Sequence, residues 1–218
     1  MGDSVLHVSF FIGVFLFIIT LIFQLTMYRY KQGRKYSFRN ELPFELVQGV
    51  DQKYIHYHYI LIFGVILAQV LFAFNYLPQL IYWYEYLLVA SVTLSAIMLY
   101  LLFFIKVFEV KRHIFVFVVQ ALSVVTSFVA FGIFVHINIY GTQSLPFAIV
   151  NYVLAFIGLI LLFNSHLRRW PIMDKVLQQD GTVLILRPRY FLLALYEWGF
   201  IILQFVQFIL MYVFLFFR

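Results

Sequence analysis

The chain contains no cysteine, and only 11% of its 218 residues are charged, against a hydrophobic share of 65%. Without cysteine there is no disulfide, no thiolate metal site, no iron–sulfur ligation and no cysteine nucleophile. A soluble domain averages about 25% charged and about 45–50% apolar residues. The composition therefore excludes a soluble globular protein, a disordered segment and a disulfide scaffold, and it indicates an integral membrane protein.

Six stretches of the sequence are long and apolar enough to cross a bilayer, whose core of about 30 Å requires about 20 residues of helix. They predict an all-α integral membrane protein, a single polytopic domain over residues 1–218 formed by a bundle of six transmembrane helices. Barrel strands would alternate in polarity, whereas these runs are continuously apolar. The sixth run is the longest, so we expect it to tilt or to extend out of the bilayer. The predicted spans are 5–27, 57–75, 86–105, 114–135, 147–163 and 190–217.

The basic residues are confined to three of the connections between these spans. All of the 15 Lys and Arg residues except Arg218 lie in the first, third and fifth connections. By the positive-inside rule these connections face the cytoplasm or an organelle matrix, which places both the N-terminus and the C-terminus outside. We therefore expect a multi-pass protein of a bacterial cytoplasmic membrane or an organelle inner membrane. This pattern also explains the net charge of +6 without a nucleic-acid partner.

The first and fifth connections are long enough to hold structure of their own. In the fifth, Asp180-Gly181 stands between two short runs with apolar and β-branched residues, which predicts a small cytoplasmic β-hairpin at residues 174–187. In the first, Leu42 and Leu46 lie among charged residues. They fit either a segment dipped into the lipid headgroups or a loop packed against the bundle.

Glu197 is the clearest ionisable residue inside a predicted span, and such residues are costly in hydrocarbon and often functional. Gln204 follows seven residues later on the same helix face, with Gln207 alongside. The functional interpretation is a site for a proton or a cation. The structural alternative is that Glu197 bonds a neighbouring helix or reaches back toward Arg187 and Arg189.

Neutral polar residues such as Gln69 occur in the other spans. Side chains of this kind commonly join helices through hydrogen bonds, and they could equally line a narrow polar path. The hypothetical ion-binding or proton-binding site therefore comprises Glu197, Gln204, Gln207, Gln120 and Asn151.

Histidines raise the further possibility of haem, because two neutral imidazoles on different helices can ligate its iron axially. The candidates at the predicted inner ends of the spans are His58, His113 and His166. All six histidines lie at span ends, where the side chain can simply be solvated, so haem is the less favoured prediction. No other cofactor and no metal site is predicted.

The sequence contains no Gly-rich phosphate loop, no nucleophile elbow, no HExxH motif and no paired intramembrane carboxylate, so it favours no enzymatic activity. The first functional interpretation is a non-catalytic subunit or accessory protein of a membrane complex. Its partners would be the lipid bilayer and other membrane subunits or further copies of the chain. The alternative is a small transporter or channel built around Glu197, and a haem-binding membrane redox protein is the third interpretation.

Overall fold

The computed structural model describes residues 2–48, 52–77, 80–105, 110–138, 144–163, 174–177, 183–186 and 192–216. Six of its helices are long and apolar enough to cross a membrane, which confirms the predicted multi-pass helical architecture. These helices are α1 (Gly2–Gln32), α3 (Ile55–Tyr76), α4 (Trp83–Phe104), α5 (Val110–Asn138), α6 (Ser144–Leu162) and α7 (Leu192–Phe214).

Three helices differ from the predicted spans by more than three residues in length. α1 has 31 residues and α5 has 29. At about 1.5 Å per residue, α1 is about 46 Å long, which exceeds the bilayer core of about 30 Å. The predicted ranges 5–27 and 114–135 cover only the apolar parts of these helices, because apolarity marks the bilayer and not the helix end. α7 has 23 residues and is shorter than the predicted range 190–217, of which residues 190, 191 and 217 lie outside the described part of the chain.

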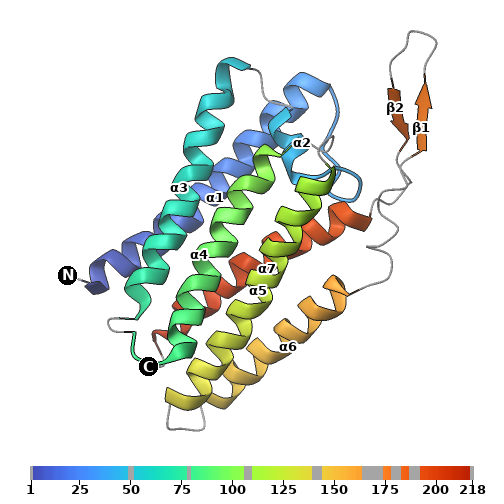
Figure 1. Ribbon diagram of the computed structural model, residues 1–218. Helices are drawn as coiled ribbons and strands as arrows, with labels where there is room; N and C mark the ends of the chain where they lie inside the picture. The colour runs from blue at the N-terminus through green and yellow to red at the C-terminus, as the bar shows by residue number, and fades with distance from the viewer. Residues whose placement is uncertain are drawn as a thin grey trace.

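α7 contacts several of the other long helices. The other five long helices pack in chain order, α1 on α3, α3 on α4, α4 on α5 and α5 on α6 (Figure 1). α7 contacts α1 through the rings of Phe10 and Tyr212, stacked at 3.7 Å between centroids, and α3 through Phe72 and Phe208. The spans of α5 and α7 are each 61% buried in protein, against 28% for α1 and 22% for α6. α1 and α6 therefore turn most of their apolar surface away from the bundle.

The start of α1 and the end of α7 lie at the same end of the bundle (Figure 1). His7 Nδ1 and the Tyr212 hydroxyl are 3.1 Å apart there. A chain that crosses a bilayer an even number of times has both of its ends on the same side, so six spans require this arrangement. The helices do not determine which side of the membrane that end faces, so the outside location of both termini stays a prediction.

The connection between α1 and α3 folds against the bundle. α1 ends at Gln32, and the next residue, Gly33, caps it: its φ is 65°, and its N–H donates to the carbonyl four residues earlier. The connection then forms the short helix α2 (Pro43–Gln48) and the 3-10 turn η1 (Gln52–Tyr54). Leu42 and Leu46 are each 0% exposed. Of the two interpretations of this segment, the structure shows the loop packed against the bundle.

Two short strands lie in the chain between α6 and α7. β1 (Asp174–Leu177) and β2 (Val183–Leu186) pair antiparallel, with Asp174 opposite Leu186. The expected turn at Asp180-Gly181 lies outside the described residues. The complete hairpin predicted for residues 174–187, and its place on the cytoplasmic side, stay predictions.

Candidate functional site

Glu197 and His113 form an ionisable pair in the interior of the bundle. Glu197 lies near the start of α7 and His113 near the start of α5, and both are 0% exposed. His113 Nε2 is 2.6 Å from Glu197 Oε1, and His113 Nδ1 is 3.2 Å from the carbonyl oxygen of Ile105, the residue that ends α4. Three helix ends therefore meet at this pair.

The hydrogen bonds of His113 determine where the protons of the pair lie. Because Nδ1 faces a carbonyl oxygen, it carries a proton and donates it, and a second proton is shared between Nε2 and Glu197. The pair is neutral overall, either as glutamic acid beside imidazole or as glutamate beside imidazolium. Each form avoids an isolated buried charge, which costs several kcal/mol. Glu197 Oε2 has no hydrogen-bond partner among the described residues, so the carboxyl group keeps one unused oxygen.

A chain of three buried amides crosses the bundle next to this pair. Gln120 Nε2 donates to Gln204 Oε1 at 3.0 Å, and Gln204 Nε2 donates to Gln69 Oε1 at 2.8 Å. The three side chains come from α5, α7 and α3, and none is more than 5% exposed. Each hydrogen bond joins two different helices, so the chain holds the core of the bundle together.

The ionisable pair and the amide chain form two successive rungs between α5 and α7. His113 and Gln120 are seven residues apart on α5, and Glu197 and Gln204 are seven residues apart on α7. The two helices run in the same direction (Figure 1). A seven-residue step returns each side chain to nearly the same face and advances it by about 10 Å along the axis. The constant spacing therefore keeps the polar residues of the two helices opposite each other.

Four of the five residues of the predicted proton or ion site make hydrogen bonds between helices, and the fifth makes one within its own helix. Besides Glu197, Gln204 and Gln120, Gln207 lies in the interior, where its Nε2 donates to the carbonyl of Ser127 on α5 at 3.4 Å. Asn151 is buried on α6, but its Nδ2 donates at 2.8 Å to a carbonyl of its own helix. The alternative partners of Glu197 proposed from the sequence, Arg187 and Arg189, lie outside the described residues.

Two of the three predicted haem histidines, His58 and His113, use ring nitrogens in hydrogen bonds. His58 Nδ1 accepts a hydrogen bond from Gln24 Nε2 at 2.7 Å, which leaves the ring proton on Nε2. Both ring nitrogens of His113 take part in hydrogen bonds, and His166 lies outside the described residues. A haem ligand must offer a ring lone pair to the iron, so either ring would have to change its partners. Haem ligation stays a prediction, for which a Soret band of the purified protein is the test.

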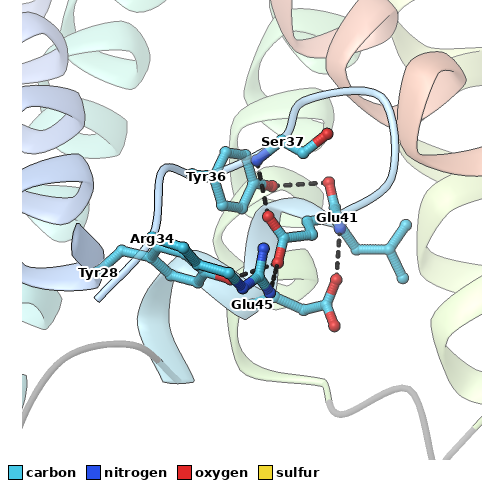
Figure 2. A network of polar contacts seen from close by, with 7 residues as sticks. Tyr28, Arg34, Tyr36, Ser37, Glu41 and Glu45 are labelled. Carbon is cyan, nitrogen blue, oxygen red and sulfur yellow. Dashed lines mark hydrogen bonds and ion pairs between the residues drawn. The ribbon is translucent and has the colours of Figure 1, made fainter. Parts of the chain in front are cut away.

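Sequence reasoning missed Glu41, which organises the segment after α1. Its carboxylate accepts hydrogen bonds from the Tyr28 hydroxyl, from Arg34 at 2.5 Å and from the Ser37 N–H at 2.6 Å (Figure 2). Glu41 is only 6% exposed. A lone acidic residue in a loop of mixed charge gives no signal in the sequence that it is buried.

Trp198 joins this segment to the helix that carries Glu197. The Trp198 indole N–H donates to the Tyr36 hydroxyl at 3.0 Å, and that hydroxyl donates to the Glu41 carbonyl at 2.7 Å. Burial raises the pKa of the Tyr36 hydroxyl well above its usual range, so the hydroxyl stays protonated and can donate. The segment after α1 therefore packs against the end of α7 where Glu197 lies.

Comparison with protein families, with curated proteins and with solved structures finds no match for this chain. A candidate function must therefore come from the geometry of the site itself. That geometry belongs to a polytopic membrane protein with six candidate membrane spans, which enclose a buried His–Glu pair and a chain of three amides.

Proposed function

We propose that the protein is a small membrane transport protein that moves protons through its helical bundle, with His113 and Glu197 as the proton-binding pair. The observation that carries this proposal is that two ionisable side chains from different helices, both 0% exposed, lie 2.6 Å apart inside candidate membrane spans. Ionisable groups within spans are rare because of their cost, and where they occur they often mark ion pathways and proton relays.

The pair exchanges the proton that lies between His113 Nε2 and Glu197 Oε1. Release of this proton leaves glutamate beside a neutral imidazole, with a net charge of −1, and uptake of another proton restores the neutral pair. The charged form is disfavoured in the low-dielectric interior, so the pair rebinds a proton readily. Glu197 Oε2 has no partner among the described residues, so in this proposal it is the carboxyl oxygen at which a proton enters or leaves the pair.

Proton flux into proteoliposomes tests this function. The purified protein is reconstituted with a pH-sensitive dye inside, and a potassium gradient with valinomycin supplies the driving voltage. We expect the wild-type protein to acidify the interior faster than empty liposomes do. Glu197→Gln keeps a side chain that can hydrogen-bond His113 but cannot release a proton, so we expect its flux to fall to that of empty liposomes.

Glu85→Gln is the matched control. Glu85 is also buried, at 7% exposed, and its Oε2 accepts hydrogen bonds from the Ile81 and Tyr82 N–H groups at the start of α4. A glutamine oxygen can accept the same bonds, so the control should keep the wild-type flux. Equal flux in the wild type and Glu197→Gln, with both proteins folded by circular dichroism, would show that the pair only joins helices.

A second function, a non-catalytic subunit of a membrane complex, is favoured by the surface of α6. Only 22% of its span is buried, and Phe156 and Ile160 are 63% and 54% exposed. Such a face suits lipid or an apolar helix of another subunit. The test is a tagged pull-down from native membranes in mild detergent with quantitative mass spectrometry. A partner at fixed stoichiometry supports this function, and recovery of the chain alone or as a homo-oligomer counts against it.

A further inference from the structure

A small cavity lies in the core of the bundle beside the amide chain. It has about 10 Å³ of space for the centre of a water molecule, and its lining comes from α3, α4, α5 and α7. Gln204 lies near the middle of α7, so the cavity that it lines lies close to the middle of the bundle. Its polar lining residues are Gln69, Ser95, Ser127, Gln204 and Gln207, and Val92, Phe208 and Met211 complete the wall.

Two amide groups that line the cavity each have one atom left over after their other hydrogen bonds are made. Gln69 Oε1 accepts from Gln204, and Gln69 Nε2 has no partner among the described residues. Gln207 Nε2 donates to the Ser127 carbonyl, and Gln207 Oε1 has no partner within the same part of the chain. Both side chains are more than nine-tenths buried, at 1% and 2% exposed. A buried amide atom without a hydrogen bond costs about 1–3 kcal/mol, so a ligand that satisfies both atoms would be stabilised here.

Two hydroxyl groups add further acceptors to the same cavity. Ser95 Oγ donates to the Val92 carbonyl at 2.8 Å, and Ser127 Oγ donates to the Val124 carbonyl at 2.7 Å. Each hydroxyl proton is therefore used within its own helix, and the oxygen keeps lone pairs that can accept. The cavity thus offers one N–H donor group from Gln69 and up to three acceptor oxygens.

We propose that this cavity binds a single water molecule, held between Gln69 Nε2 and Gln207 Oε1 with the two serine hydroxyls as further partners. A water needs about 10–15 Å³ of such space and two to four polar partners, and the cavity supplies both. A cation would face the N–H group of Gln69, which repels it. An organic solute would need many times the volume.

The water site also indicates which class of substrate is transported. This part of the inference rests on the proposed function. Among the described residues, this cavity at the middle of the bundle has about 10 Å³ of space for the centre of a water molecule, which suits one water. A proton can move along hydrogen bonds through a bound water, whereas a sugar, an amino acid or a hydrated metal ion cannot enter. The transported species is therefore the proton itself, without a co-transported solute on this route.

Nuclear magnetic resonance of the full chain in lipid bilayers tests the site independently of transport. The glutamine side chains are labelled with ¹⁵N, the Gln69 signal is assigned by its loss in Gln69→Leu, and magnetisation transfer from water is measured. We expect transfer to the Gln69 NH₂ group. Gln120 donates to Gln204 but does not itself line the cavity, so its NH₂ group is the internal reference and should show none.

A matched pair of serine variants shows whether the water lies in this cavity. Ser95→Thr adds a methyl group to the cavity wall, and we expect it to abolish transfer to Gln69. Ser91→Thr makes the same change one turn earlier on α4, at a buried serine that does not line the cavity, and should leave transfer unchanged.

Each outcome separates the water site from the proposed function. Absence of transfer to Gln69 in the folded wild-type protein, or transfer that persists equally in Ser95→Thr, overturns the water site even if proton flux is observed. Transfer to Gln69 that is lost in Ser95→Thr supports the water site. If such a protein carries no flux above that of empty liposomes, the proposed function fails and the water site stands.

Discussion

Glu41 shows how one buried carboxylate can hold a whole connection in place. Its two oxygens accept from a phenol, a guanidinium and a backbone N–H, all of which belong to the segment that follows α1 or to the last turns of α1 itself. Leu42, the next residue, is then 0% exposed. The polar cluster therefore positions the apolar residues of the connection against the bundle.

Removal of this carboxylate should cost far more than removal of its charged partner. Glu41→Ala leaves the buried Tyr28 hydroxyl and the Ser37 N–H without acceptors, so we expect the free energy of unfolding to fall by about 2–4 kcal/mol. Arg34 has a side chain that is 58% exposed, and Arg34→Ala should cost only about 0–1 kcal/mol. Denaturant unfolding in detergent micelles measures both values. Equal losses would mean that the ion pair, and not the buried acceptor, stabilises the segment.

Tyr36 makes the same segment sensitive to alkaline pH. Burial raises the pKa of its hydroxyl in the folded protein above the value of about 10 of an unfolded chain. The stabilisation is therefore fully present below about pH 10 and is lost as the pH rises through the folded pKa. The midpoint of thermal unfolding should fall above about pH 10, and it should fall less steeply in Tyr36→Phe. Parallel curves for the two proteins would contradict this role of Tyr36.

Glu197 could be found from the sequence, whereas its partner could not. A carboxylate within an apolar run stands out because of its cost in hydrocarbon. His113 lies at the edge of such a run, where a histidine can equally be solvated, and nothing in one sequence states which helix faces which. Gln24 and His58, which bond each other at 2.7 Å between α1 and α3, illustrate the same limit. A single polar residue within a span can be recognised in the sequence. Which two residues form a pair depends on how each helix is rotated about its axis.

Close packing of α5 against α6 depends on glycine. A Cβ atom at Gly158 on α6 would lie 2.7 Å from Cγ2 of Val125 on α5, and Val125 is only 5% exposed. A β-branched side chain has little freedom to move aside. Small residues at such positions let membrane helices approach closely. The pairing of α5 and α6 is therefore fixed by shape as much as by apolarity.

Gly158→Ala should separate these helices, whereas Gly199→Ala should not disturb the bundle. At Gly158 we expect a loss of about 1–3 kcal/mol from overpacking. At Gly199 on α7 no atom lies within 4 Å of an added Cβ, so alanine should be neutral or should gain up to about 1 kcal/mol of helix propensity. Unfolding midpoints in detergent measure both variants. A similar loss for both would place the cause in the helix backbone and not at the interface.

At the level of elements, the sequence predicts helices well and their ends less well. Apolar runs reveal the six spans because lipid requires them. α1 continues to Gln32 and α5 begins at Val110, beyond the apolar parts, because a helix can extend into water where no residue stops it. Gly33 is such a stop. The short helix α2 went unpredicted, since six residues carry too little periodicity to be recognised.

The orientation of the whole molecule can be tested directly because the chain has no cysteine. Ser4 near the start of α1 and Lys35 shortly after its end are both exposed, and Ser4→Cys and Lys35→Cys each introduce the single thiol of the chain. In intact cells a membrane-impermeant maleimide should label the Ser4→Cys variant. It should label the Lys35→Cys variant only after the membrane is permeabilised. The reverse pattern would overturn the assignment of the basic connections to the inner side.

For the whole molecule, the central claim is that the buried His113–Glu197 pair carries protons and does not only join helices. The most direct measurement is voltage-driven proton flux in proteoliposomes for the wild type, Glu197→Gln and Glu85→Gln at equal protein content. The account predicts flux above that of empty liposomes for the wild type and Glu85→Gln, and none above it for folded Glu197→Gln. Flux that is the same in Glu197→Gln and the wild type, or no wild-type flux at all, would contradict it.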